Sequence, residues 1–203
     1  MTAPRAPCFG AVLAGGQSRR MGADKAALAI DGVPLWRRQL RVLRDAGVSD
    51  PVLVRGPGQP APEGVRILRD LHPGIGPMGG LHAALAAAGD APLALLAVDM
   101  PGIGPDWFAW LLGHCGDGTG AMARHALGCE PLAAVYPPSA LPLVDEAVSR
   151  GDYSLQRLAV ALAGSGRMRL VDLGPAEVDR VRSVNTPLDS GAWGAVGPPG
   201  AGL

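Results

Sequence analysis

The feature that most constrains the fold is a short apolar run that ends abruptly in two adjacent glycines. Residues 9–14 read FGAVLA, which predicts a buried first strand, and Gly15 and Gly16 follow at once. Two adjacent glycines let the backbone turn sharply and approach a ligand without intervening side chains. Shortly after them come three basic residues, Arg19, Arg20 and Lys25. A strand, a glycine turn and basic side chains in this order indicate a cradle for an anionic group such as phosphate.

This loop matches neither of the two common glycine motifs for nucleotides. A Walker loop needs Ser or Thr after its lysine, whereas Lys25 is followed by Ala26. The dinucleotide fingerprint needs Gly-x-Gly-x-x-Gly, and the glycine spacing here differs. The residues alone therefore predict a phosphate site of another kind.

Strands and helices alternate through the first half of the chain, which predicts a parallel α/β sheet covered by helices on both faces. Residues 93–98 (LALLAV) form a continuously apolar strand of the kind that is buried on both faces. Residues 71–80 are expected to form a flexible glycine-rich stretch, and residues 181–185 a last extended piece. The other expected strands are 51–55, 65–68, 120–124, 132–136 and 168–173. The expected helices are 35–46, with Gln39 interrupting its apolar pattern, 81–88, 105–114, 141–150 and 155–163.

Three polar features follow strands and should therefore meet at one edge of the sheet, where open α/β sheets bind ligands. They are the glycine loop, Asp70 after the third strand, and Asp99 after the apolar strand 93–98. Asp99 is either a turn or capping residue or a Mg²⁺ ligand, and its combination with the basic loop favours the metal, which binds hard oxygen ligands and substrate phosphates. The glycines of residues 76–80 either form a tight turn into a helix or a wall for a flat base near Asp70.

Composition narrows the function classes. Lys and Arg number 18 and Asp and Glu also 18, so no net charge attracts nucleic acid or an anionic membrane. Three scattered cysteines indicate neither a disulfide framework nor a zinc site, and no secretory leader or membrane span is evident. We expect a cytoplasmic protein, with residues 1–190 as one domain and residues 191–203 as a flexible tail. No serine or cysteine stands in a nucleophile motif, whereas phosphoryl or nucleotidyl transfer needs mainly positioning and charge neutralisation.

The loop LAGGQSRRMGADK resembles the signature of the nucleotidyltransferase superfamily, and most closely that of the molybdenum cofactor guanylyltransferase family. Four further stretches resemble that family in the same order along the chain, so the resemblance covers nearly all of it. They are Asp70 with residues 73–81 (PGIGPMGGL), residues 98–101 (VDMP), residues 130–136 (EPLAAVY) and residues 184–189 (VNTPLD).

The resemblance implies a three-layer, Rossmann-like nucleotidyltransferase fold and an enzyme that joins GTP to molybdopterin or Mo-molybdopterin with release of pyrophosphate. It implies nucleotide contacts from Leu13, Ala14, Gly15, Gly16, Lys25, Asp70 and Asp99. Arg20 and Lys25 would neutralise the triphosphate, Asp70 would contact the nucleoside, and Asp99, with Asn185, would bind Mg²⁺. Expected protein partners are molybdenum-insertion proteins or molybdoenzyme chaperones.

One departure concerns the base. The family often carries an Asn in the loop after the second strand, whereas residues 54–58 here read VRGPG. Two alternatives follow from the sequence. One is a nucleotidyltransferase of the same fold that uses CTP or another triphosphate, with molybdopterin or a sugar or alcohol phosphate. The other is a nucleotide-binding protein without catalysis.

Overall fold

A single large sheet runs through the protein. The computed structural model describes residues 8–15, 25–70 and 72–183. Within them the sheet has eight strands, in the order β10-β7-β9-β6-β1-β4-β5, with β8 paired to β7. Their bounds are β1 Phe9–Leu13, β4 Val52–Arg55, β5 Ile67–Arg69, β6 Leu93–Ala97, β7 Gly120–His125, β8 Gly128–Cys129, β9 Ala133–Tyr136 and β10 Met168–Asp172. A separate small hairpin pairs β2 (Ala29–Ile30) with β3 (Val33–Pro34).

The sheet is mostly parallel, which confirms the predicted α/β class. The pairs β1–β4, β1–β6, β4–β5 and β7–β10 are parallel. Strand β9 runs antiparallel to both of its neighbours, β6 and β7, so β7 and β10 point the same way as β1 and β6. The carboxyl ends of six strands therefore lie along one edge, together with the start of β9.

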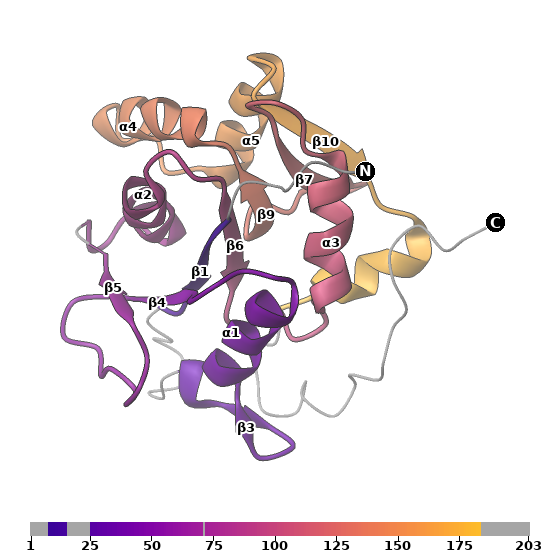
Figure 1. Cartoon of the computed structure of the whole chain (residues 1–203). Helices are drawn as coiled ribbons and strands as arrows, with labels where there is room; N and C mark the ends of the chain where they lie inside the picture. The colour runs from indigo at the N-terminus through magenta and orange to yellow at the C-terminus, as the bar shows by residue number, and fades with distance from the viewer. Residues whose placement is uncertain (1–7, 16–24, 71, 184–203) are drawn as a thin grey trace.

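Helices cover both faces of the sheet (Figure 1). On one face lie α1 (Leu35–Asp45) and α3 (Pro105–His114), and on the other α2 (Pro77–Ala88), α4 (Leu141–Ser149) and α5 (Leu155–Gly164). The described residues also include the short 3-10 helices η1 (Lys25–Ala27), η2 (Pro138–Ala140) and η3 (Pro175–Val181). This three-layer arrangement is the one that the resemblance implied.

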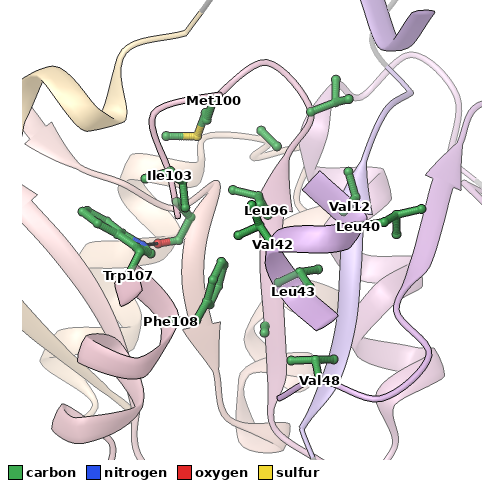
Figure 2. Close-up of a cluster of buried hydrophobic side chains, with 14 of the residues drawn as sticks. Val12, Leu40, Val42, Leu43, Val48, Leu96, Met100, Ile103, Trp107 and Phe108 are labelled. Atoms are coloured by element: carbon green, nitrogen blue, oxygen red, sulfur yellow. Dashed lines mark hydrogen bonds between the residues drawn. The ribbon is translucent and has the colours of Figure 1, made fainter. Parts of the chain in front are cut away.

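Strand β1 contributes to two separate hydrophobic clusters because alternate side chains of a strand point to opposite faces. Val12 packs with α1 and α3, whereas Ala11 and Leu13 pack under α2. Figure 2 shows the first cluster, where Leu40 and Leu43 of α1 approach Val12 and Leu96. Every residue of β6 is buried, as the apolar run predicted.

Helix α2 begins earlier than predicted. Residues 77–80 were expected in a flexible stretch before a helix at 81–88, but the helix starts at Pro77. Pro is favoured in the first turn of a helix. Gly79 and Gly80 lie inside the helix and let it pack close to its neighbours, since a Cβ on Gly80 would lie only 2.9 Å from Leu13 Cδ2.

The structure departs from the sequence predictions in other places as well. The stretch between the expected strands 120–124 and 132–136 contains a further short strand, β8. Val181 was expected to open an extended piece, but it closes η3, and residues 184–185 lie outside the described part. The predicted tail at 191–203 lies outside it as well, so the domain division stays a prediction. None of the described helices is long and apolar enough to cross a membrane.

Candidate active site

A cavity of about 560 Å³ opens at the carboxyl edge of the sheet. Its walls come from segments that follow four neighbouring parallel strands, β1, β4, β5 and β6, and from the start of α2. The lining residues are Leu13, Ala14, Gly15, Val54, Gly56, Pro57, Gln59, Asp70, Pro73, Gly74, Gly76, Pro77, Gly80, Ala97, Val98, Asp99 and Leu132. The polar features that the sequence predicted for this edge therefore share one cavity.

Backbone hydrogen bonds extend the strand ladder into the cavity wall. The Ala14 N–H donates to Val54 O (2.9 Å), and the Val98 N–H donates to Leu13 O (3.0 Å). The Asp70 N–H donates to Arg55 O (3.0 Å). These bonds fix the chain at the points where the glycine loop, Asp70 and Asp99 begin.

The loop after β4 is a tight turn that is stabilised by hydrogen bonds to a glutamine and an arginine side chain. Gly56–Gln59 closes with a bond from Gln59 N–H to Gly56 O (3.3 Å), and Gly58 has φ 72°. Pro at the second position and Gly at the third are typical of a type II turn. The Gln59 side chain accepts from Gly56 N–H (2.8 Å) and reaches Gly15 O (3.4 Å). Arg69 Nη1 donates to the carbonyls of both Gly56 and Gln59.

Sequence reasoning missed Gln59, which stands in the loop where the family's Asn was sought. Its only sequence signal is the Pro-Gly pair before it, which predicts a turn but not the direction of the side chain. It missed Arg55 as well, which is 1% exposed and donates from Nη1 to Ala14 O (2.9 Å). The two side chains tie the loop after β4 to the glycine loop after β1.

The Asp70 carboxylate is held in place by a hydrogen bond within a local turn. Its Oδ1 accepts a hydrogen bond from the His72 N–H at 2.8 Å, an arrangement typical of Asp at turns. The carboxylate also lies against the first turn of α2, where a Cβ on Gly79 would be 2.5 Å from Oδ1. Helix N-termini attract acidic side chains, which agrees with the position of Asp70 beside the start of α2.

Asp99 is half-buried and lines the cavity beside the end of β1. One carboxylate next to the predicted phosphate site fits Mg²⁺, which usually binds through one or two carboxylates together with substrate phosphates. Within residues 8–15, 25–70 and 72–183 no group of three or more His, Cys, Asp and Glu side chains is arranged to hold a metal ion.

Farther along the same edge of the sheet, two polar side chains are hydrogen-bonded to each other. His125 at the end of β7 and Glu130 before β9 are joined by a 2.6 Å hydrogen bond between Nε2 and Oε1. Because His125 Nδ1 accepts from the Leu127 N–H, Nε2 carries the proton and donates to the carboxylate. Burial raises the pKa of Glu130, and the bond from His125 opposes that shift. Glu130 lies two residues before Leu132, which lines the cavity.

The structure brings together five of the predicted site residues, namely Leu13, Ala14, Gly15, Asp70 and Asp99. Lys25 begins η1, and its side chain is outside the described part of the structure. Gly16, Arg20 and Asn185 lie outside the described residues altogether. The role of each residue stays a prediction.

Comparison with known proteins agrees with this architecture. Residues 10–165 match the MobA-like NTP transferase domain. The chain belongs to this family. It is therefore a nucleotidyltransferase, as the resemblance implied. A relative from Opitutus terrae, described as a probable molybdenum cofactor guanylyltransferase, is 47% identical over 193 residues, covering 93% of this chain and 96% of the relative. A Deinococcus radiodurans relative with the same description is 34% identical, covering 76% of this chain and 80% of the relative.

Two solved structures illustrate how widely the fold is shared. Molybdopterin-guanine dinucleotide biosynthesis protein A from Archaeoglobus fulgidus superposes with a TM-score of 0.66 at 24% identity, covering 90% of this chain and 95% of that one. A cytidylyltransferase for 2-C-methyl-D-erythritol 4-phosphate from Thermus thermophilus gives a TM-score of 0.67 at 16% identity, covering 91% and 96%. At these identities the likeness concerns the fold.

Proposed function

We propose that this MobA-like transferase moves a GMP moiety from GTP to the terminal phosphate of molybdopterin or Mo-molybdopterin and releases pyrophosphate. The observation that carries the proposal is the shared cavity: the backbone of residues 13–15, Asp70 and Asp99 all line it. The names of the curated relatives, which are described as molybdenum cofactor guanylyltransferases, support the choice of GTP and of the acceptor.

In this proposal each group has a separate task. The backbone of Leu13, Ala14, Gly15 and Gly16 holds the nucleotide at close range, since glycines leave room for phosphate. Arg20 and Lys25 neutralise the triphosphate and the departing pyrophosphate. Asp70, fixed by His72 N–H and lying beside α2, accepts hydrogen bonds from the nucleoside.

Asp99, with Asn185, would hold Mg²⁺. A divalent metal is supported by a solved Mycobacterium tuberculosis protein of the same fold, whose title names a complex with manganese. That structure superposes with a TM-score of 0.54 at 20% identity, covering 82% of this chain and 89% of that one. When bound, the metal supplies positive charge that stabilises the phosphate oxygens in the transition state. The residues of the chain bind and orient the reactants.

The reaction needs no protein nucleophile. An oxygen of the acceptor phosphate forms a bond to the α-phosphorus of GTP while the bond from that phosphorus to the bridging oxygen breaks. Pyrophosphate leaves with the electron pair of the broken bond. Because an alkyl phosphate loses its second proton with a pKa near 6, the acceptor is mostly dianionic at neutral pH and needs little help from a base. Positioning and charge neutralisation are then the main sources of catalysis.

The test is pyrophosphate release with each nucleoside triphosphate, Mg²⁺ and either molybdopterin or a sugar phosphate. We expect turnover with GTP and molybdopterin. Turnover with CTP or UTP but not with GTP would reject the guanylyl assignment and favour another nucleotidyltransferase of this fold. Asp99→Ala should abolish release while the protein remains folded. If Asp99→Ala leaves the activity of cellular molybdoenzymes intact while nucleotide still binds, the chain is a nucleotide-binding protein and not a catalyst of this step.

A further inference from the structure

The segment that carries Asp99 is tied to α1 by one buried amide. Gln39 Nε2 donates to Met100 O at 2.7 Å and approaches Ala97 O at 3.4 Å. These two carbonyls lie on either side of Asp99 in the chain. A single NH₂ group has two N–H donors, so it can bind both ends of the segment at once.

The rest of the segment is held by packing and by the sheet. Before Asp99, the Val98 N–H donates to Leu13 O (3.0 Å). After it, Met100 and Ile103 are each 2% exposed and belong to the α1–α3 cluster, at the end of the cluster where β6 stops (Figure 2). The backbone around Asp99 is therefore constrained on both sides while its side chain faces the cavity.

Packing alone does not account for a glutamine at position 39. Its side chain is 0% exposed and lies in a helix face whose other buried members are Leu35, Leu40, Val42 and Leu43. A buried amide costs free energy unless its polar atoms are hydrogen-bonded. Among the described residues Oε1 has no hydrogen-bond partner, so the contribution of this amide comes from its donor group. Leu or Met would fill the same volume without an unsatisfied acceptor.

We propose that Gln39 is a positioning residue that sets the place of the Asp99 carboxylate, and so the affinity of the site for metal-bound nucleotide. The inference rests on the proposed function, in which Asp99 is a metal ligand. Residues that orient metal ligands typically change metal affinity about 10–100-fold when they are replaced.

Two substitutions of opposite chemistry test the idea. Gln39→Leu keeps the volume and removes both donors, which leaves the Ala97 and Met100 carbonyls without this partner. Gln39→Glu sets a carboxylate oxygen against carbonyl oxygens, which repel it. A protonated carboxyl at position 39 regains one donor, so the defect of Gln39→Glu should shrink as the pH falls. Gln39→Leu has no ionisable group at this position, so its defect should stay constant over the same pH range.

The measurement is calorimetric titration of the protein with GTP, once in the presence of Mg²⁺ and once in the presence of EDTA. The ratio of the two affinities reports the metal's contribution without any turnover. For Gln39→Leu we expect this ratio to fall about tenfold while the affinity in EDTA stays unchanged. Leu158→Ala is the matched control, because Leu158 is buried in the cluster on the opposite face of the sheet. It should lower thermal stability and leave the ratio unchanged.

The outcomes separate this inference from the proposed function. If folded Gln39→Leu keeps the ratio of the parent chain while Asp99→Ala loses it, Gln39 has no positioning role and the metal role of Asp99 stands. If Asp99→Ala also keeps the ratio, the metal assignment in the proposed function is wrong, and the inference falls with it. Should Gln39→Leu not fold, Gln39→Met decides in its place by the same ratio, since it too lacks the donors.

Discussion

The Asp70 carboxylate occupies the space that a side chain at Gly79 would need. A Cβ on Gly79 would lie 2.5 Å from Asp70 Oδ1, 2.8 Å from Oδ2 and 2.9 Å from the His72 carbonyl oxygen. Real Cβ atoms do not approach other atoms so closely, so either the carboxylate or the helix must move. The glycine thus sets where the Asp70 carboxylate lies in the cavity wall.

Gly79→Ala should therefore weaken nucleotide binding. Ala favours a helix over Gly by about 1 kcal/mol, but here the clash with Asp70 opposes that gain. We expect the affinity for GTP to fall roughly tenfold, equivalent to about 1.4 kcal/mol, as measured by calorimetry. Gly113→Ala is the control, because Gly113 lies in α3 with no atom within 4 Å of a Cβ. It should leave binding unchanged and raise the free energy of unfolding. Equal binding by both variants would contradict a role for the Asp70 position.

Gly15 gives a graded test of the glycine loop. A Cβ at this position would lie 3.3 Å from Gly56 N, which is tight but requires only a small shift. Gly15→Ala should therefore fold and bind with reduced affinity. Gly15→Val should abolish triphosphate binding, because its additional methyl groups would enter the space that the phosphates approach. Calorimetry with GTP measures both variants, and an unchanged affinity for Gly15→Val would show that the loop is structural.

The Gly56–Gln59 turn predicts a difference between two nearby arginines. Arg69 binds the carbonyls of Gly56 and Gln59, whereas Arg66 makes an exposed 3.4 Å contact with Asp50. Arg69→Met should loosen the turn and raise the KM for GTP, and Gln59→Ala should do the same through its lost contacts with Gly15 and Gly56. Arg66→Met should leave the KM unchanged, since exposed ion pairs contribute little. A KM for Arg69→Met equal to that of Arg66→Met would refute this role.

Acid should destabilise the protein partly through Asp152. Hydrogen bonds from Arg157, then from the Ser154 N–H, lower the pKa of Asp152 from 3.8 to about 2. A carboxyl whose pKa is lower in the folded state stabilises the fold above its unfolded pKa and loses this contribution as the pH falls through its folded pKa. The window is therefore from about pH 4 down to pH 2.

Urea unfolding at a series of acidic pH values measures this contribution. Asp152→Asn should show a shallower loss of stability across that window than the parent chain. Arg157→Gln should flatten the profile in the same way, because it removes the other half of the pair. The double variant should add nothing further, and additive effects would mean that the two residues act separately.

The sequence predicted the layers of this fold better than it predicted the details of its loops. The apolar run before Asp99 and the alternation of strands with helices fix a buried, mostly parallel sheet. The direction of β9 is not readable in this way, because a buried strand looks alike in either direction. The start of α2 was missed because Gly79 and Gly80 have low helix propensity, and the close approach of Asp70 and Leu13, which explains why glycines stand in this helix, is not visible in the sequence.

In the candidate site, too, the sequence predicted what strand ends determine and missed what distant contacts determine. Asp70 and Asp99 were predictable because they stand at strand ends, and strand ends meet at one edge. Gln39 was not, because an amide within an amphipathic helix looks like an interruption of the apolar pattern. Its partners, Ala97 and Met100, are about 60 residues away in the chain, and no local pattern records so distant a contact.

The backbone hydrogen bonds of the sheet continue into the cavity wall, which links opening of the site to opening of the sheet. The amides of Ala14, Val98 and Asp70 donate to carbonyls of neighbouring strands whose residues are almost all buried. The Asp70 amide bonds across the edge strand β5 and can exchange when that edge opens. The amides of Ala14 and Val98 bond between central strands and exchange with solvent deuterium only when these strands separate, so their exchange should follow unfolding of the whole sheet. A ligand that binds only the folded chain then slows their exchange in proportion to its own binding. The amides of Ala14 and Val98 would therefore act as internal reporters of occupancy, and this part of the site could not unfold independently of the domain.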